Sequence, residues 1–354
     1  MSKSITPLSE IGLFGLIERI EKQFPKQRKD TIVGVENDPA AIASEGNDLV
    51  TANAILLEGI HFDLTYFPLK HLGYKAVVSA ISDVIASGAR PSHISLSLGL
   101  SGKMSLEAVD LFMEGVAMAC EKYELDLAGF RPSSSLTGLT IAATAYGFAE
   151  RNYIVQRSGA RENDLICVTG DLGAAFMGLQ LLEREKKVLK ETGEQNPDFG
   201  NYDYLLERQL KPEARIETLD KFDEAQIYPT SMTLVREGLS SALIRMCQSS
   251  GIGCNIYENK LPIDHTTTAL AEEMQMNPLV AALNGGEDFE LLFTISLDDY
   301  KEIEKGRKKL QDIFLIGHIT PHSKGYTMET NAGQEIDLKA RGWGKDDEPQ
   351  AGNQ

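Results

Sequence analysis

The stretch RSGARENDLICVTGDLGAAFMGLQLL, residues 157–182, decides the fold of the second half of the chain. Asp164 to Thr169 is a short apolar run, typical of a buried strand, and it leads into the glycine turn Gly170–Gly173. The apolar periodicity that follows predicts a helix from Ala174 to Leu189. A tight strand-to-helix turn explains the two glycines better than a phosphate-binding loop, because this spacing alone is a weak phosphate signal.

The alternation of strand and helix continues towards the C-terminus. Residues 190–204 are polar and rich in Asn, Asp and Gly, which predicts an excursion loop. Further helices and strands lead to ALNGGEDFELLFTI (282–295) and LIGHIT (315–320). The polar tail from Lys345 is expected to fray.

The first half of the chain mixes strands and helices in the same way. Apolar residues at helical spacing, with Ser9 as the cap, predict a helix over 9–24. Alternating or continuous apolar runs predict the remaining elements: strands at 48–60, 92–100, 125–129 and 138–149, and helices at 71–87 and 105–123. We therefore expect one domain over 1–150, a second over 151–344, and a disordered tail over 345–354.

Composition narrows the class of protein. The chain has 354 residues, of which 42% are hydrophobic, and this is enough for one large or two medium cores. A formal net charge of -17 without a dense basic block argues against nucleic acid and anionic lipid as partners. The polar N-terminus does not resemble a signal peptide, and no apolar run approaches the ~20 residues of a membrane span.

The cysteines point to a reducing compartment. The four cysteines, Cys120, Cys167, Cys247 and Cys254, have no CxxC spacing, and the first three lie in apolar surroundings. Buried free thiols explain this pattern better than disulfides or zinc. We expect a cytoplasmic protein.

Several segments, in order and spacing, resemble the thiamine-monophosphate kinase family over roughly residues 9–343. The resemblance is carried by LLEGIHFDLTYFPLKHLGYKA (56–76), SDVIASGARP (82–91), residues 157–182, LERQLKPEAR (206–215), NGGEDFELLFT (284–294), IGHIT (316–320) and the closing Gly342-Trp343.

The resemblance implies a two-domain fold of the aminoimidazole-ribonucleotide synthetase type, combining α+β and α/β features. Its N-terminal mixed-sheet domain dimerises, its C-terminal domain is α/β, and MgATP and thiamine monophosphate bind in the cleft between them. The implied reaction moves the γ-phosphoryl group of ATP onto thiamine monophosphate, which gives thiamine diphosphate. A homodimer with bound Mg²⁺ and ATP is therefore the expected working form.

Such a reaction depends on carboxylates, because magnesium prefers hard oxygen ligands and must neutralise the phosphates before attack. By resemblance the remaining metal ligands are Asp38, Asp83 and Glu237. Four family acids are replaced, at Asn37, Asn53, Arg131 and Leu234, and two cations, Arg131 and Arg236, enter the site. We therefore expect weakened MgATP binding and impaired or absent transfer.

The resemblance also assigns the other ligand contacts. The residues implied on the ATP side are Thr51, Asn53, Gly129, Arg131, Arg157 and Arg236. The residues implied in the substrate pocket are His61, Phe62, Glu287 and Trp343. An aromatic ring such as that of Trp343 suits a cationic thiazolium, because a π-face attracts cations.

Each assignment has a simpler structural alternative. Asp38 and Asp83 could be surface or capping acids, and Glu237 could be an acid at a helix N-terminus. His61 and Trp343 could serve packing alone, and Glu287 belongs to a glycine turn that serves backbone geometry. Arg131 and Arg236 either bind phosphate directly where magnesium once bridged it, or point to solvent.

Three functions follow from these alternatives. The first is an inactive or impaired homologue that binds thiamine monophosphate or a related phosphate ester. The second is an active thiamine-monophosphate kinase with a metal site rearranged around Asp38, Asp83 and Glu237. The third is a subunit without catalysis that pairs with an active partner.

Overall fold

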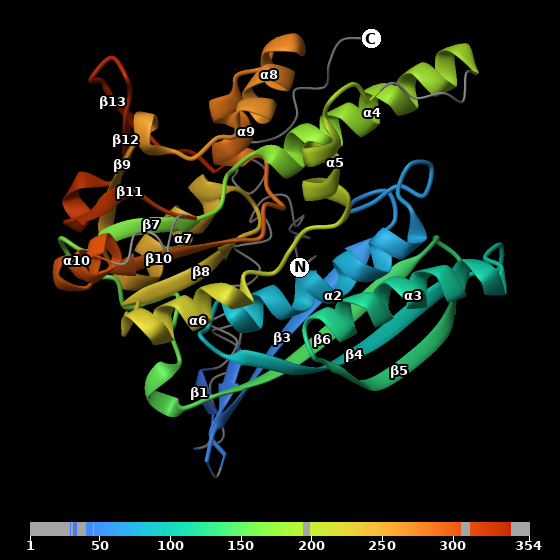
Figure 1. Cartoon of the computed structure of the whole chain (residues 1–354), viewed down its shortest axis with the longest axis horizontal. Coiled ribbons are helices and arrows are strands. Elements are labelled where there is room, and N and C mark those ends of the chain that lie inside the picture. Colours follow the sequence, from blue (N-terminus) through green and yellow to red (C-terminus); the bar gives the residue numbers. More distant parts are fainter. Residues whose placement is uncertain are drawn as a thin grey trace, which may run out of the picture.

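Two β-sheets, one from each half of the chain, organise the molecule, and helix α2 lies between them (Figure 1). The computed structural model describes residues 29, 31–33, 40–44, 46–193, 199–305 and 312–340. The expected helix over 9–24 and the tail from Lys345 lie outside the described residues.

The first sheet has six described strands in the order β1-β2-β3-β6-β4-β5. Its pairing is antiparallel except between β4 and β5, so the expected mixed sheet is confirmed. Its strands are β1 (Thr31–Val33), β2 (Ala40–Ile42), β3 (Asp48–Leu57), β4 (Arg90–Ser101), β5 (Asp126–Ser135) and β6 (Thr140–Ala149).

The residues of strand β3 point alternately to the buried face and to the exposed face of the sheet. Side chains at even positions, from Val50 to Leu56, are buried, whereas Thr51, Asn53 and Ile55 are partly or largely exposed. Because successive strand residues point to opposite faces, the even positions face α2 and the odd positions face away from it. We call the second surface the open face of the first sheet.

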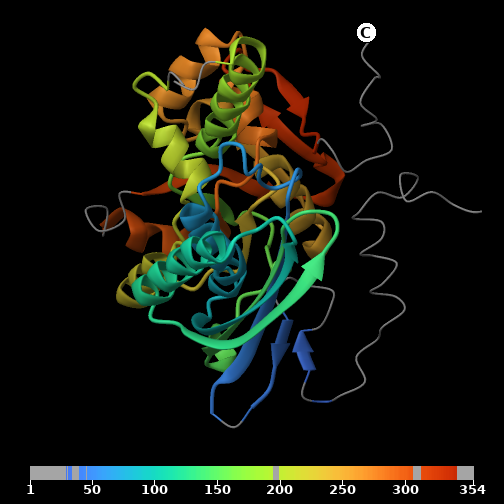
Figure 2. The same ribbon diagram turned by 90° about the vertical axis from the view of Figure 1, so that its right-hand side faces the viewer.

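Helices α2 (Leu69–Ile85) and α3 (Leu106–Lys122) cover one face of this sheet (Figure 2). Almost every residue of α2 is buried, which fits its continuous apolar sequence and its position between the sheet, α3 and the second half. Ser105 caps α3 by accepting a hydrogen bond from the Ala108 backbone N–H. Glycines let the two helices approach closely, since a Cβ at Gly73 would lie 2.0 Å from the Phe112 carbonyl oxygen.

The second sheet has seven described strands in the order β13-β12-β9-β11-β7-β10-β8. Among these described strands, β12 and β9 alone pair in parallel. Its strands are β7 (Leu165–Thr169), β8 (Ser231–Val235), β9 (Gly253–Tyr257), β10 (Glu290–Ile295), β11 (Ile313–Thr320), β12 (Tyr326–Glu329) and β13 (Glu335–Asp337).

Several helices pack around the second sheet. The longest is α4, and it ends at Gly193, whose φ of 72° is a left-handed conformation that suits glycine. The α-helices are α4 (Ala174–Thr192), α5 (Asp203–Leu210), α6 (Ile216–Ala225), α7 (Leu239–Ser250), α8 (His265–Glu273), α9 (Pro278–Asn284) and α10 (Leu297–Lys305). Short 3-10 turns are η2 (Arg151–Tyr153), η3 (Glu258–Lys260) and η4 (His322–Lys324).

The predicted strand–turn–helix at 164–189 is confirmed by β7 and α4. The predicted loop over 190–204 is wrong at both ends, because α4 continues to Thr192 and α5 begins at Asp203. Strand β3 stops at Leu57, and the following residues turn, so the predicted strand to residue 60 was too long. Strand β5 continues beyond the predicted residue 129 to Ser135.

The predicted free thiols are confirmed, with Cys167, Cys247 and Cys254 buried and Cys120 partly buried. Among the described residues, no helix combines the length and apolar character needed to cross a membrane.

Candidate functional site

A pocket of about 450 Å³ lies between the two halves. Its walls come from the turn after β3, from α4, and from the turns that precede α7 and β10. The lining residues are Gly59, Ile60, His61, Phe62, Asp63, Tyr66, Phe176, Leu179, Gln180, Glu183, Lys186, Gln209, Arg236, Glu237, Gly285, Gly286 and Glu287. We call this the interdomain pocket, and it brings together His61, Phe62 and Glu287, the three described residues expected to contact substrate.

The turn after β3 holds His61 and Phe62. The Leu57 backbone N–H donates to His61 Nδ1 at 3.1 Å, which fixes the ring and leaves Nε2 as the possible donor. Burial lowers the pKa of His61, so the imidazole is neutral at pH 7. Phe62 is buried and packs edge-on against Phe67, with 6.4 Å between ring centroids. The turn therefore presents a fixed neutral imidazole to the pocket.

Glu287 is held in place by a lysine that belongs to α2. Lys75 is fully buried, and its Nζ lies 2.8 Å from Glu287 Oε2 and 2.8 Å from the carbonyl oxygen of Gln209. Glu287 has a left-handed φ of 61°, and its backbone N–H donates to the Arg236 carbonyl oxygen at 2.6 Å. The carboxylate is therefore anchored from the first half of the chain, while its backbone belongs to the second.

Arg236 connects the pocket to Asp83 on α2. Its Nη2 lies 2.7 Å from Asp83 Oδ2 and also donates to the Ser79 carbonyl oxygen. The guanidinium lies 5.9 Å from the centroid of the Phe289 ring. Asp83 is thus neither a surface acid nor a helix cap: it is 8% exposed and paired with a cation from the other half. Arg236 does not swing out to solvent.

A charged cluster forms the outer wall of the pocket. Lys186 Nζ on α4 lies 2.8 Å from Asp63 Oδ2, and the Tyr66 hydroxyl donates to Glu183 Oε1 at 2.7 Å. Burial alone would raise the pKa of Asp63, but hydrogen bonds from Lys186 and Thr65 lower it to about 2. These contacts fasten the turn after β3 to α4.

Of the residues expected on the ATP side, Arg236 lines the interdomain pocket and the others lie elsewhere. Thr51, Asn53 and Arg131 are on strands of the first sheet and do not line the interdomain pocket. Strand register places Asn53 opposite Thr144, Thr144 opposite Ser95, and Ser95 opposite Gly129, so Asn53 and Gly129 belong to one row across the sheet.

Asn53 and Asp83 lie on different sides of β3. Asn53 accepts a hydrogen bond from Thr144 Oγ1 at 2.8 Å on the open face, whereas Asp83 belongs to the helix on the other face. The structure therefore does not bring these two positions together. On β3, the neighbours of Asn53 that face α2 are Ala52 and Ala54.

Arg157 is buried in the second half of the chain, with Nε 3.3 Å from Ser249 Oγ. Glu237 lines the interdomain pocket immediately before α7, next to Arg236. Asp38, expected as a metal ligand, and Trp343, expected in the substrate pocket, lie outside the described residues.

Two of the three expected metal ligands, Asp83 and Glu237, lie within the described residues. No group of three or more His, Cys, Asp or Glu side chains in the described ranges is arranged to hold a metal ion. Asp83 is instead neutralised by Arg236. Leu234, at a position where the resemblance implies an acid, is buried in β8.

Most of the residues that line the interdomain pocket, or that hold those residues in place, were not predicted from the sequence. Lys75, Asp63, Tyr66, Glu183, Lys186 and Gln209 all contribute contacts within or beneath it. Lys75 offered a signal, since a lysine inside the otherwise apolar helix 71–87 needs a buried partner. The other residues carried no local signal, because their partners are distant in sequence.

Comparisons with known proteins agree with this architecture. The family described as AIR synthase related protein, N-terminal domain, matches residues 36–149. A thiamine-monophosphate kinase from Aquifex aeolicus is 33% identical over 81% of this chain and 87% of its own length. Another from Buchnera aphidicola subsp. Schizaphis graminum is 32% identical over 91% of this chain and 95% of its own length.

Solved structures give the same result. The structure of AaThiL complexed with AMPPCP and TMP superimposes with a TM-score of 0.79 at 30% identity, and covers 95% of this chain and 98% of that one. The expected fold class is therefore confirmed. The chain belongs to the thiamine-monophosphate kinase family.

Proposed function

We propose that this chain binds thiamine monophosphate, or a related phosphate ester, in the interdomain pocket, and that phosphoryl transfer from MgATP is impaired. Family membership supports the ligand, since a relative has been solved in complex with TMP and with AMPPCP. The observation that carries the proposed impairment is the Arg236–Asp83 ion pair beside the pocket.

The chemistry of the pocket suits this ligand. The neutral His61 has Nε2 available to donate to a phosphate oxygen, and the Arg236 guanidinium supplies positive charge. Glu287 and Glu237 supply negative charge for a cationic thiazolium, and Phe176 adds an aromatic surface. Both ends of a zwitterionic ester therefore find complementary groups.

The ion pair explains why phosphoryl transfer would be impaired. If magnesium were to bind Asp83, it would first have to displace a guanidinium held 2.7 Å away. When bound, Mg²⁺ would neutralise the triphosphate and orient it for attack. Arg236 can carry charge towards a phosphate, but it cannot offer the several coordination positions of a metal ion.

Calorimetry tests the binding part of this proposal. Thiamine monophosphate is titrated into the full chain in EDTA and again in MgCl₂, and we expect the same affinity in both. His61→Ala should weaken binding at least tenfold, while Arg161→Ser, at an exposed arginine away from the pocket, should not. Binding that requires magnesium would contradict the proposal.

Turnover tests the catalytic part. Formation of thiamine diphosphate is measured with MgATP at high protein concentration, and we expect little product from the unmodified chain. Rapid, magnesium-dependent formation would instead support the second candidate, an active kinase that uses Asp38, Asp83 and Glu237. That alternative draws support from the position of Glu237 in the same pocket as Arg236.

We also propose a homodimer formed through the open face of the first sheet. Ile55 and Phe148, both on this face, are 56% and 42% exposed, which is unusual for large apolar side chains on a sheet. Light scattering after size exclusion measures the mass directly. A monomer at micromolar concentration would exclude the proposal.

A further inference from the structure

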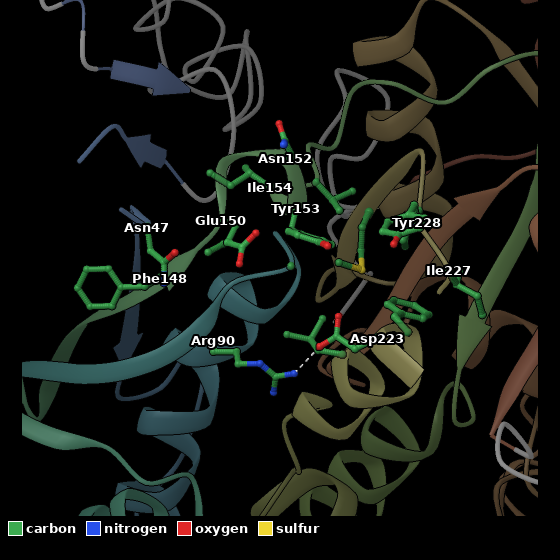
Figure 3. A pocket seen from close by; sticks show the side chains of 17 residues that line it. Asn47, Arg90, Phe148, Glu150, Asn152, Tyr153, Ile154, Asp223, Ile227 and Tyr228 are labelled. Atoms are coloured by element: carbon green, nitrogen blue, oxygen red, sulfur yellow. Dashed lines mark hydrogen bonds and ion pairs between the residues drawn. The ribbon is translucent and has the colours of Figure 1, made fainter. Parts of the chain in front are cut away.

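A second pocket lies between the two halves, at the opposite end of β3 from the interdomain pocket (Figure 3). We call it the connector pocket, because the segment that links the two halves, from Ala149 to Val155, forms one of its walls. Its volume is about 390 Å³, within the range that holds a small ligand. The proposed function does not use it.

The floor of the connector pocket is apolar and buried. Phe222 on α6, Ile227 and Met232 are at most 5% exposed. Phe222 also packs edge-on against Phe293 of the second sheet, with 5.0 Å between centroids. A ligand that reaches this floor therefore contacts apolar side chains.

Two tyrosines form an aromatic wall. Tyr153 and Tyr228 have ring centroids 6.0 Å apart and planes inclined by 36°, and they are 42% and 48% exposed. Rings need about 7 Å between them to admit a third, twice the ~3.5 Å contact distance. A flat ligand therefore stacks against the wall as a whole and does not enter between the rings.

The mouth of the pocket is acidic. Glu150 and Asp223 line it together with Arg90, as Figure 3 shows. Arg90 already lies 2.7 Å from Asp220 and 2.8 Å from Asp223, so two carboxylates offset its single charge. Glu150 lines the pocket as well and adds a further carboxylate, while Arg90, the one guanidinium in the lining, is already paired. The excess negative charge disfavours phosphates and favours cations.

We propose that the connector pocket binds a flat heteroaromatic cation. Tyrosine faces attract a delocalised positive charge, and the acidic mouth adds to this attraction. The apolar floor accepts the ring system, and the volume limits the ligand to about one or two fused rings. Residues from both halves line the pocket, so the ligand bridges them across the connecting segment.

The test uses 1-methylquinolinium as the probe and the neutral 1-methyl-2-quinolone as its matched control. Both are titrated into the full chain by ligand-observed NMR. We expect the cation to bind at least fivefold more tightly, a factor typical of a cation–π contact. Equal binding of the two compounds, or no binding of the cation at millimolar concentration, would overturn the proposal.

Variants locate the site. Tyr228→Leu and Glu150→Gln should each weaken binding of the cation about threefold or more, whereas Tyr228→Phe keeps the ring and should bind normally. His61→Ala, which acts on the interdomain pocket, should leave binding unchanged. Loss of binding in this control, or unchanged binding in Tyr228→Leu, would place the cation elsewhere and refute the assignment.

Discussion

At the scale of single residues, the Lys75–Glu287 pair shows how burial determines which partner costs more stability when it is removed. Lys75 is fully buried, whereas the Glu287 side chain is 28% exposed. If the lysine is removed, the remaining carboxylate can still contact water. If the glutamate is removed, a buried ammonium remains, and it donates to the Gln209 carbonyl oxygen. An uncompensated buried charge is the costlier outcome.

We therefore predict that Glu287→Leu destabilises the chain by about 3 kcal/mol, and more than Lys75→Met does. The double variant should recover part of the loss, because it leaves no unpaired charge. Urea unfolding of the four proteins gives the free energies. Equal losses in the two single variants would show that water reaches Lys75 in spite of its burial.

Asp288 makes the free energy of unfolding depend on pH. Burial raises the pKa of this carboxyl to about 7, although the Gly173 N–H donates to it. Folding therefore takes up a proton between about pH 4 and pH 7, and the free energy of unfolding falls as the pH rises through this range. We predict that Asp288→Asn removes this slope, which is about 1 kcal/mol per pH unit. Urea unfolding of both proteins at pH 5, 6 and 7 measures this slope. Identical slopes in the two proteins would contradict the prediction.

At the scale of elements, the packing of α2 against α3 is limited by two glycines. A Cβ at Gly115 would lie 1.8 Å from the Lys70 carbonyl oxygen, which is backbone and cannot move aside cheaply. We predict that Gly115→Ala costs about 3 kcal/mol, because the helices must separate. Gly102→Ala is the control, since a Cβ there meets nothing within 4 Å. Thermal unfolding compares the stability of the two variants with that of the unmodified chain. If Gly115→Ala left the stability unchanged, α3 would be able to shift away from α2 at no cost.

Elements were the part of the structure most open to prediction from sequence. Apolar periodicity located α2, α3 and α4, because each has a continuous or helical apolar pattern. Ends were less predictable: β5 runs through Pro132, a residue that normally ends a strand. Hydrogen bonding between β5 and β4 continues the strand through Pro132 in spite of the local preference of proline.

The site was less predictable than the elements. His61, Phe62 and Glu287 come together as expected, but Glu287 and its partner Lys75 are 212 positions apart. No local pattern reports such a contact. Strand alternation, in contrast, could have shown that Asn53 faces away from α2, since Ala52 and Ala54 supply the apolar side of β3.

At the scale of the whole molecule, Glu213 couples the two halves. Its Oε2 accepts from Tyr74 at 2.7 Å, Tyr123 at 2.6 Å and Lys122 at 2.6 Å, all from α2 and α3 or their ends. We predict that Glu213→Ala lowers the free energy of unfolding by about 2 kcal/mol, because charged hydrogen bonds are lost and two tyrosine hydroxyls lose an acceptor.

The same change should separate the unfolding of the halves. Hydrogen exchange of α2 should accelerate relative to that of the second sheet, while Glu162→Ala, at an exposed position without such contacts, should behave like the unmodified chain. Uniform acceleration across both sheets would show that Glu213 acts on global stability alone.

The position of β5 has a consequence for association in solution. As the terminal strand of its sheet in one chain, it offers backbone groups to any strand that docks alongside it. Arg131 and Pro132 occupy its middle: the arginine brings a charge, and the proline lacks the N–H that a growing ladder would need. Arg131 and Pro132 therefore act as a barrier to fibril-like polymerisation along this edge.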